Sequence, residues 1–214
     1  MAQGIVVLIS GSGTNLQAII DEVKAGNIQG EISAVISNRP GVKGLERAQQ
    51  AGIPTEVLDH KGFPDRESFD QAMIQLIDQH EPKVIVLAGF MRILTTEFVN
   101  HYLGRLINIH PALLPKYKGL HTHQRALAAG DTEHGCTVHF VTPELDDGPN
   151  ILQAQVPVLP EDDESSLSAR VQQQEHIIYP LAVQWFMEQR IAMRDGKAWL
   201  DQQPLPESGH VVSH

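Results

Sequence analysis

Residues 5–15, with the sequence Ile-Val-Val-Leu-Ile-Ser-Gly-Ser-Gly-Thr-Asn, decide the fold class of this protein. Their first five residues form an unbroken apolar run rich in β-branched side chains, which is typical of a strand buried on both faces. A glycine-rich loop follows, and apolar residues then recur at helical spacing at Leu16, Ile19, Ile20 and Val23. The stretch therefore predicts a strand, a glycine loop and a helix in direct succession.

The same alternation continues along the chain. We predict further strands at residues 32–37, 54–58, 84–88, 106–110, 137–141 and 151–158. We predict helices at residues 44–51, 66–80, 95–102, 122–129 and 164–189, the last broken or bent near Pro180. Such alternation favours an α/β fold with a mostly parallel central sheet and helices on both faces.

Length and composition limit the organisation of the chain. The 214 residues, 42% of them hydrophobic, suffice for one sizeable core, so we expect one compact domain over residues 1–200. Residues 201–214 have little to bury, and we expect them to be a mobile tail. The sequence does not indicate whether the protein is a monomer or a homodimer.

Charge and cysteine content exclude several classes of partner. The net charge of -10 disfavours nucleic acid, because that binding depends on clustered Lys and Arg. The single cysteine, Cys136, permits no intramolecular disulfide and fits a cytoplasmic location. The apolar run at residues 5–9 is too short to cross a membrane, and no basic segment precedes it, so we expect neither a membrane span nor a signal peptide.

The glycine loop is a candidate anion site. Backbone N–H groups and the positive end of a helix dipole favour a phosphate there. A dinucleotide site is disfavoured, because Leu16 stands where a third glycine is needed and Asn38 follows the second strand instead of an acidic residue. The alternative is a tight turn with a Thr or Asn helix cap and no ligand.

Asn108 and His110 are the candidate catalytic pair. They are two positions apart in a predicted strand, so both side chains point to one face at its carboxyl end, where open α/β sheets bind ligands. An amide and an imidazole together can hold an oxyanion and move a proton, which acyl transfer requires. Alternatively, His110 is a strand-end histidine that only bonds a loop.

Asp146 is a candidate partner of His110. If the helix at residues 122–129 is a crossover, the strand at residues 137–141 ends near His110, and Asp146 then reaches the imidazole. A carboxylate there favours the imidazolium and orients the ring. The composition of residues 144–149 also fits an ordinary acidic turn. The long loop at residues 111–120 carries two prolines, and we expect it to be a functional segment or a lid.

Five stretches together carry a family resemblance. They are Gly-Ser-Gly-Thr-Asn at residues 11–15, Leu-Ala-Gly-Phe-Met-Arg-Ile-Leu at 87–94, Asn-Ile-His-Pro-Ala-Leu-Leu-Pro at 108–115, Gly-Leu-His-Thr-His at 119–123 and Glu-Leu-Asp at 144–146. In this order they resemble the phosphoribosylglycinamide formyltransferases. The resemblance implies a Rossmann-like formyltransferase fold and a folate-dependent formylation step of purine synthesis, without a metal. It also implies a phosphate-binding half at about residues 1–100 and a folate and catalytic half at about 101–200.

The resemblance assigns roles residue by residue. It implies that His110 is the general acid and oxyanion partner, that Asn108 holds the formyl oxygen and that Asp146 tunes His110. The phosphate and ribose of glycinamide ribonucleotide are assigned to Gly13, Thr14, Asn15, Gln172, Gln173, Gln174 and Glu175. The 10-formyltetrahydrofolate cosubstrate is assigned to Arg66, Met91, Arg92, Ile93, Leu94, Asn108, Thr142, Pro143, Glu144, Leu145 and Asp146. By pattern alone, Arg92, Ile93 and Leu94 are equally well explained as core and helix-start residues.

Several features depart from this assignment or compete with it. Asp147 stands beside Asp146 where many members of the family have glycine, and we expect its charge to alter the loop conformation or to raise the pKa of a neighbouring carboxylate. His121 and His123 are two residues apart and have no accompanying Cys or convergent carboxylate, so they are weak evidence for a metal site. Cys136 has no activating motif and is expected to be a small buried residue.

Other activities share parts of this pattern. A methionyl-tRNA formyltransferase is expected to need a basic RNA-binding surface, usually on an added domain, and the length and acidity of this chain oppose that alternative. A formyltetrahydrofolate hydrolase is expected to carry a regulatory domain before the first strand, and here that strand is expected to begin at about Gly4. A nucleotide-binding module without enzymatic activity explains the glycine loop but leaves Asn108, His110 and Asp146 unexplained.

Overall fold

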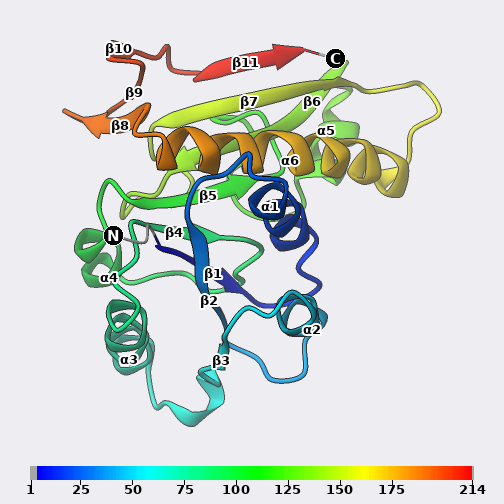
Figure 1. Cartoon of the computed structure of the whole chain (residues 1–214). Coiled ribbons are helices and arrows are strands. Elements are labelled where there is room, and N and C mark those ends of the chain that lie inside the picture. The colour runs from blue at the N-terminus through cyan, green and yellow to red at the C-terminus, as the bar shows by residue number, and fades with distance from the viewer. Residues whose placement is uncertain (1–3, 214) are drawn as a thin grey trace. The chain divides into compact units, whose positions relative to one another are not determined.

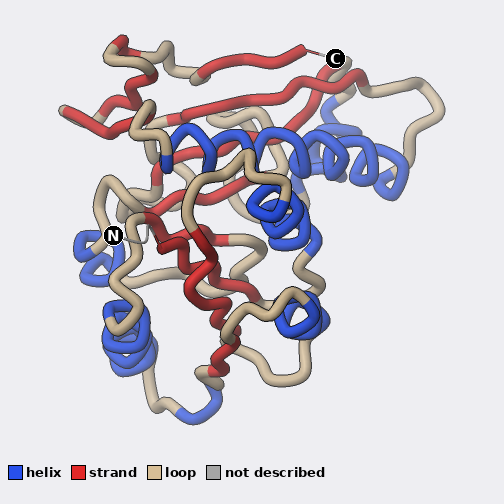
Figure 2. The backbone as a smooth tube through the Cα atoms, viewed as in Figure 1, coloured by secondary structure: helices blue, strands red, loops and turns tan. Residues whose placement is uncertain are grey.

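The computed structural model describes residues 4–213, and the chain divides into two compact α/β units with the boundary after Ile107 (Figure 1). Strands and helices alternate along both, as Figure 2 shows by colour, and most of the strand pairs are parallel. The prediction of a mostly parallel α/β fold is confirmed.

The first unit contains a parallel sheet of strand order β4-β1-β2-β3. Its strands are β1 Gly4–Ile9, β2 Glu31–Ser37, β3 Thr55–Val57 and β4 Val84–Leu87. Every residue of β1 and β4 is buried. Helices cover both faces of the sheet, so neither face of these strands is open to solvent. This burial explains why the sequences of β1 and β4 are apolar without interruption.

Helices α1 and α2 lie on one side of these strands and α3 and α4 on the other (Figure 1). Their bounds are α1 Thr14–Lys24, α2 Lys43–Gln50, α3 Arg66–Asp78 and α4 Thr96–His101, with a short 3-10 helix at His60–Gly62. Asp65 begins α3 by accepting a hydrogen bond from the Ser68 backbone N–H at 2.7 Å. Thr95 begins α4 in the same way. The segment of residues 88–95 therefore runs from the end of β4 to a capped helix.

The second unit has strand order β11-β7-β6-β5, in which β6 and β7 are antiparallel. The bounds are β5 Leu106–His110, β6 Glu133–Phe140 and β7 Asn150–Pro157. The bounds of β5 agree with the prediction. β6 begins four residues before the predicted start at residue 137, because its pairing with β7 supplies backbone partners to the polar residues Glu133 and His134.

Helix α5 spans Thr122–Ala129, as predicted, and α6 spans Glu164–Met187 and packs along β6 and β7. A capping box between Asp163 and Ser166 begins α6. We expected a break or bend near Pro180, but the helix is unbroken there. Pro180 removes one backbone donor, while the buried apolar face on both sides of it keeps the helix packed.

The C-terminal residues differ from the expected mobile tail. Strands β8 Ile191–Arg194, β9 Lys197–Leu200 and β10 Gln203–Pro204 form a three-stranded sheet. The last strand, β11 His210–Ser213, pairs in parallel with β7. We expected residues 201–214 to be mobile because they have little to bury, yet the edge of β7 provides backbone partners to β11. His214, the last residue of the expected tail, lies outside the described residues.

Within residues 4–213, no helix is both long enough and apolar enough to cross a membrane.

Candidate active site

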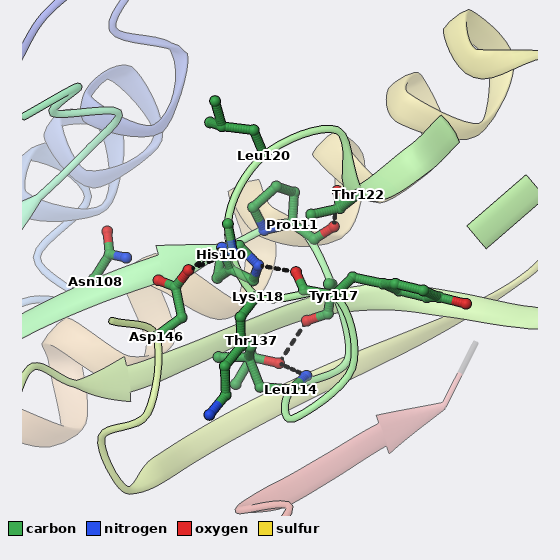
Figure 3. A network of polar contacts seen from close by, with 12 residues as sticks. Asn108, His110, Pro111, Leu114, Tyr117, Lys118, Leu120, Thr122, Thr137 and Asp146 are labelled. Carbon is green, nitrogen blue, oxygen red and sulfur yellow. Dashed lines mark hydrogen bonds and ion pairs between the residues drawn. The ribbon is translucent and has the colours of Figure 1, made fainter. Parts of the chain in front are cut away.

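Strand β5 presents the candidate catalytic pair. Its apolar residues Leu106 and Ile107 are fully buried, and they fix the strand in the sheet. His110, the last residue of the strand, is 6% exposed, and Asn108 is half-buried. Figure 3 shows both side chains on β5, with Asp146 beside His110. The predicted strand-end position of the pair is therefore found.

The two ring nitrogens of His110 have different partners. Nε2 lies 2.7 Å from the backbone carbonyl oxygen of Tyr117. Because a carbonyl oxygen only accepts hydrogen bonds, Nε2 is the donor and carries a proton. Nδ1 faces Asp146 Oδ2 at 3.6 Å. This distance suits an ion pair and is longer than a direct hydrogen bond. Nδ1 therefore lies near a carboxylate without a close hydrogen bond to it.

The turn after β6 holds the carboxylate of Asp146 in place. Asp146 has a positive φ of 49°, and its Oδ2 accepts a hydrogen bond from the Gly119 backbone N–H at 2.9 Å. Gly148 allows the turn to close, since a Cβ there would lie 1.7 Å from the carbonyl oxygen of Phe140. The side chain of Asp146 is 11% exposed, so its charge acts on His110 with little screening by solvent. The predicted approach of Asp146 to His110 is found.

His139 orients the amide of Asn108, and the sequence analysis missed it. Burial lowers the pKa of His139 to about 4, so the ring is neutral near pH 7. Its Nδ1 donates to the carbonyl oxygen of Phe140 at 2.9 Å, which leaves Nε2 as an acceptor for Asn108 Nδ2 at 3.3 Å. An amide nitrogen carries two hydrogens, so Asn108 keeps a second donor for a carbonyl oxygen. The available sequence signal was a histidine between the apolar residues Val138 and Phe140.

The loop at residues 111–121 forms one wall of the site and supplies the Tyr117 carbonyl. Tyr117 Oη donates to Asp131 at 2.6 Å, and Arg125 donates to the carbonyl oxygen of Lys118 at 2.7 Å. Thr122 Oγ1 donates to the Pro111 carbonyl oxygen at 2.6 Å, closing the base of the loop (Figure 3). A backbone carbonyl carries no sequence signal, so this partner of His110 was not predictable.

The glycine loop leads directly into α1, as predicted. Gly13 is the N-cap residue with φ 71°, and no side chain caps the helix, so the alternative of a Thr or Asn cap is not found. A Cβ on Gly13 would lie 2.6 Å from Gly44 Cα, so glycine is required there for packing against the start of α2 as well. Thr14 and Asn15 occupy the first turn of α1. Binding of a phosphate by these residues stays a prediction.

The residues assigned to the ribose lie on α6. Gln172 and Gln173 are exposed, Gln174 is half-buried and Glu175 is 9% exposed. They belong to the second unit, whereas the glycine loop belongs to the first.

Exposed apolar side chains mark the residues assigned to folate. Met91 is 63% exposed and Ile93 59% in the first unit, and Leu145 is 57% exposed in the second. Met91 and Ile93 are therefore not core residues, while Arg92 and Leu94 are half-buried, and α4 begins after this segment at Thr96. The Met91 backbone N–H donates to Ser10 Oγ at 2.8 Å, and the Arg92 guanidinium lies 4.5 Å from the centre of the Phe69 ring. Arg66 is the first residue of α3. Exposed apolar side chains of this kind suit an organic ligand.

The competing features have structural explanations. His123 Nδ1 lies 3.0 Å from His134 Nε2, and residues 4–213 contain no group of three or more metal-binding side chains. Cys136 is buried, which raises the pKa of its thiol and opposes a nucleophilic role. Asp147 forms an ion pair with Lys118.

Comparisons with known proteins agree with this geometry. The formyl transferase family matches residues 3–183. A phosphoribosylglycinamide formyltransferase of Escherichia coli (strain K12) is 59% identical over 208 residues, covering 97% of this chain and 98% of that protein. The solved phosphoribosylglycinamide formyltransferase of Coxiella burnetii is 54% identical, with a TM-score of 0.94 over 99% of both chains.

A longer relative shares the same region. The trifunctional purine biosynthetic protein adenosine-3 of Drosophila melanogaster is 51% identical over 181 residues, which cover 84% of this chain and 13% of that protein. Because the family match extends over most of the chain and two relatives align over nearly all of it, the chain belongs to the formyl transferase family.

Proposed function

We propose that this formyltransferase moves the formyl group of 10-formyltetrahydrofolate to the amino group of 5'-phosphoribosylglycinamide, in the synthesis of purines. The observation that carries the proposal is the grouping of Asn108, His110 and Asp146 around one point of the second unit. The relatives named phosphoribosylglycinamide formyltransferase support the choice of acceptor. The lone buried cysteine fits a cytoplasmic setting.

The reaction makes a C–N bond and breaks another. The acceptor amine attacks the formyl carbon, and the carbonyl oxygen becomes an oxyanion. The second N–H of Asn108 and the protonated Nδ1 of His110 stabilise that oxyanion. Breaking the bond to the folate nitrogen restores the carbonyl, the attacking amine loses a proton, and the folate nitrogen gains one. Because Nε2 is anchored on the Tyr117 carbonyl oxygen, Nδ1 is the nitrogen that takes part in proton transfer.

The remaining assigned residues bind the two substrates. In this proposal Gly13, Thr14 and Asn15 bind the phosphate at the start of α1, where backbone N–H groups and the helix dipole favour an anion. Gln172, Gln173, Gln174 and Glu175 bind the ribose. The folate is bound by Arg66 and Met91–Leu94 of the first unit and by the turn Thr142–Asp146 of the second. Met91, Ile93 and Leu145 have exposed apolar side chains, which suit contact with an organic ligand. No metal takes part.

A competition assay tests the proposal. The purified protein receives 10-formyltetrahydrofolate with glycinamide ribonucleotide, with initiator tRNA, or with water alone as the acceptor. We expect formylation of the ribonucleotide, because the net charge of -10 opposes binding of tRNA. Formylation of tRNA, or hydrolysis unaffected by the ribonucleotide, overturns the choice of acceptor. Light scattering of the same sample distinguishes a monomer from a homodimer.

A further inference from the structure

Two segments of the second unit are joined at adjacent positions beside the candidate site. Asp146 Oδ2 accepts a hydrogen bond from the Gly119 backbone N–H at 2.9 Å. The next residue, Asp147, forms an ion pair through Oδ1 with Nζ of Lys118, the residue before Gly119. Consecutive residues of the turn after β6 thus contact consecutive residues of the loop at residues 111–121.

The same two segments hold opposite sides of the His110 ring. The loop binds Nε2 through the Tyr117 carbonyl oxygen at 2.7 Å, and the turn presents Asp146 to Nδ1 at 3.6 Å. Three consecutive residues of the loop therefore make one contact each. Tyr117 contacts the ring of His110, Lys118 contacts Asp147, and Gly119 contacts Asp146. Any sliding of the turn against the loop changes the distance between Nδ1 and the carboxylate.

The Asp146 position needs such support for two physical reasons. Asp146 and Tyr117 both have positive φ, at 49° and 55°, a backbone conformation that non-glycine residues keep only where surrounding contacts enforce it. In addition, Asp147 places a second negative charge beside Asp146. The Lys118 ammonium neutralises that charge, so the two carboxylates do not drive each other apart.

We propose that Lys118 and Asp147 are positioning residues for formyl transfer, whose ion pair holds the turn against the loop and so keeps the Asp146 carboxylate on Nδ1 of His110. The inference rests on the proposed function of His110. Neither side chain contacts the ring; their effect passes through Tyr117, Gly119 and Asp146.

The exposure of the pair limits the size of its effect. Lys118 is 38% exposed and Asp147 53%, and ion pairs of such exposure change an equilibrium by a factor of up to about five. Since the carboxylate acts on the reacting complex, the loss should appear in kcat, with little change in KM for the acceptor. Salt weakens a solvent-exposed ion pair, so kcat of the wild-type protein should decline toward that of the variants as ionic strength rises.

Charge-removal and charge-exchange variants test this proposal. Asp147→Asn and Lys118→Gln should each lower kcat by about twofold to fivefold at low salt. The double variant should be no slower than either single variant, because both changes break one interaction. The exchange Lys118→Asp with Asp147→Lys should recover most of the loss. Lys116→Gln is the matched control, because Lys116 lies in the same loop but pairs with Asp131 at 3.4 Å, so its removal should leave kcat and its salt dependence unchanged.

A second measurement does not depend on activity. Ring-nitrogen NMR should show a changed Nδ1 signal of His110 in Asp147→Asn, because the Asp146 carboxylate then moves relative to the ring, and no change in Lys116→Gln. Single variants with wild-type kcat and unchanged His110 signals overturn the proposal, as do losses that simply add in the double variant. Thermal melting identifies any variant that fails to fold, in which case the remaining single variants and their NMR signals decide. A wild-type protein without formyl transfer refutes the proposed function, while the NMR comparison still tests the ion pair.

Discussion

At the scale of single residues, His110 combines an anchored nitrogen with a reactive one. Nε2 is fixed by the Tyr117 carbonyl oxygen and Nδ1 faces Asp146. The interpretation that His110 bonds a loop is confirmed, and its role in proton transfer stays a prediction. The bond to the loop leaves Nδ1 facing the carboxylate of Asp146.

We predict that His110→Ala lowers kcat by about a hundredfold to ten-thousandfold, the usual contribution of a general acid or base. Because the imidazole acts mainly in the transition state, calorimetry should show both substrates bound nearly as in the wild-type protein. His101→Ala is the control, since His101 is 41% exposed and contacts Asp78 and the Tyr102 ring, all in the first unit. Wild-type turnover in His110→Ala would remove this residue from the mechanism.

We predict that Asp146→Asn lowers kcat by about tenfold to a hundredfold, because an interaction with a charged group is worth about 1.5–3 kcal/mol. The amide carries no charge to stabilise the ring in the transition state, so the loss should appear in kcat with little change in KM. Ring-nitrogen NMR should show an altered Nδ1 signal of His110, because the group facing this nitrogen has changed. If the His110 signals do not change, Asp146 acts on folate and not on the ring.

At the scale of elements, the C-terminal strand shows how a polar segment acquires structure. β11 pairs with the edge of β7, and Gly209, just before it, has φ 73° and passes close to that strand. A Cβ on Gly209 would lie 2.6 Å from the carbonyl carbon of Ile151 in β7. Backbone atoms in a strand cannot move aside as a flexible side chain can. The glycine is therefore required for this pairing.

We predict that Gly209→Ala destabilises the protein by about 2–4 kcal/mol, the sum of the strain of a positive φ and an overpacked contact. Gly196→Ala is the matched control: its φ is 71°, but nothing lies within 4 Å of a Cβ there, so only the strain of about 1 kcal/mol remains. Urea unfolding of both variants measures the difference. Equal losses would mean that β11 does not pack tightly on β7.

At the scale of the whole molecule, buried histidines make stability depend on pH. Burial lowers the pKa of His134 and of His139 to about 4, and it also lowers the pKa of His123. An unfolded histidine titrates near 6.5. Between these values the unfolded chain binds more protons than the folded one, so stability is fully present above about pH 6.5 and is lost as pH falls toward 4.

We predict that the free energy of unfolding falls by about 3 kcal/mol for His139 alone when pH decreases from about 7 to 4. His134→Phe should make this dependence less steep, because one group no longer titrates differently in the two states. Denaturant unfolding at a series of pH values provides the measurement. A free energy that stays constant from neutral pH to about 4 would show that these rings are charged in the folded protein.

Local pattern by itself determined the α/β class, the bounds of β5 and α5, and the strand-end placement of Asn108 and His110. These follow from residue spacing, because periods of two and of 3.6 decide which side chains share a face. The approach of Asp146 to His110 was predictable only through an assumed crossover.

The tertiary structure decided the remaining contacts. They are the hydrogen bond of His110 Nε2 to the Tyr117 carbonyl oxygen, the hydrogen bond between Asn108 and His139, the ion pair of Lys118 with Asp147 and the pairing of β11 with β7. Every residue has a carbonyl and every strand edge has unpaired backbone groups, so composition cannot say which of them will meet. That choice depends on how the folded chain brings distant segments together, and it places the partners that orient the catalytic side chains.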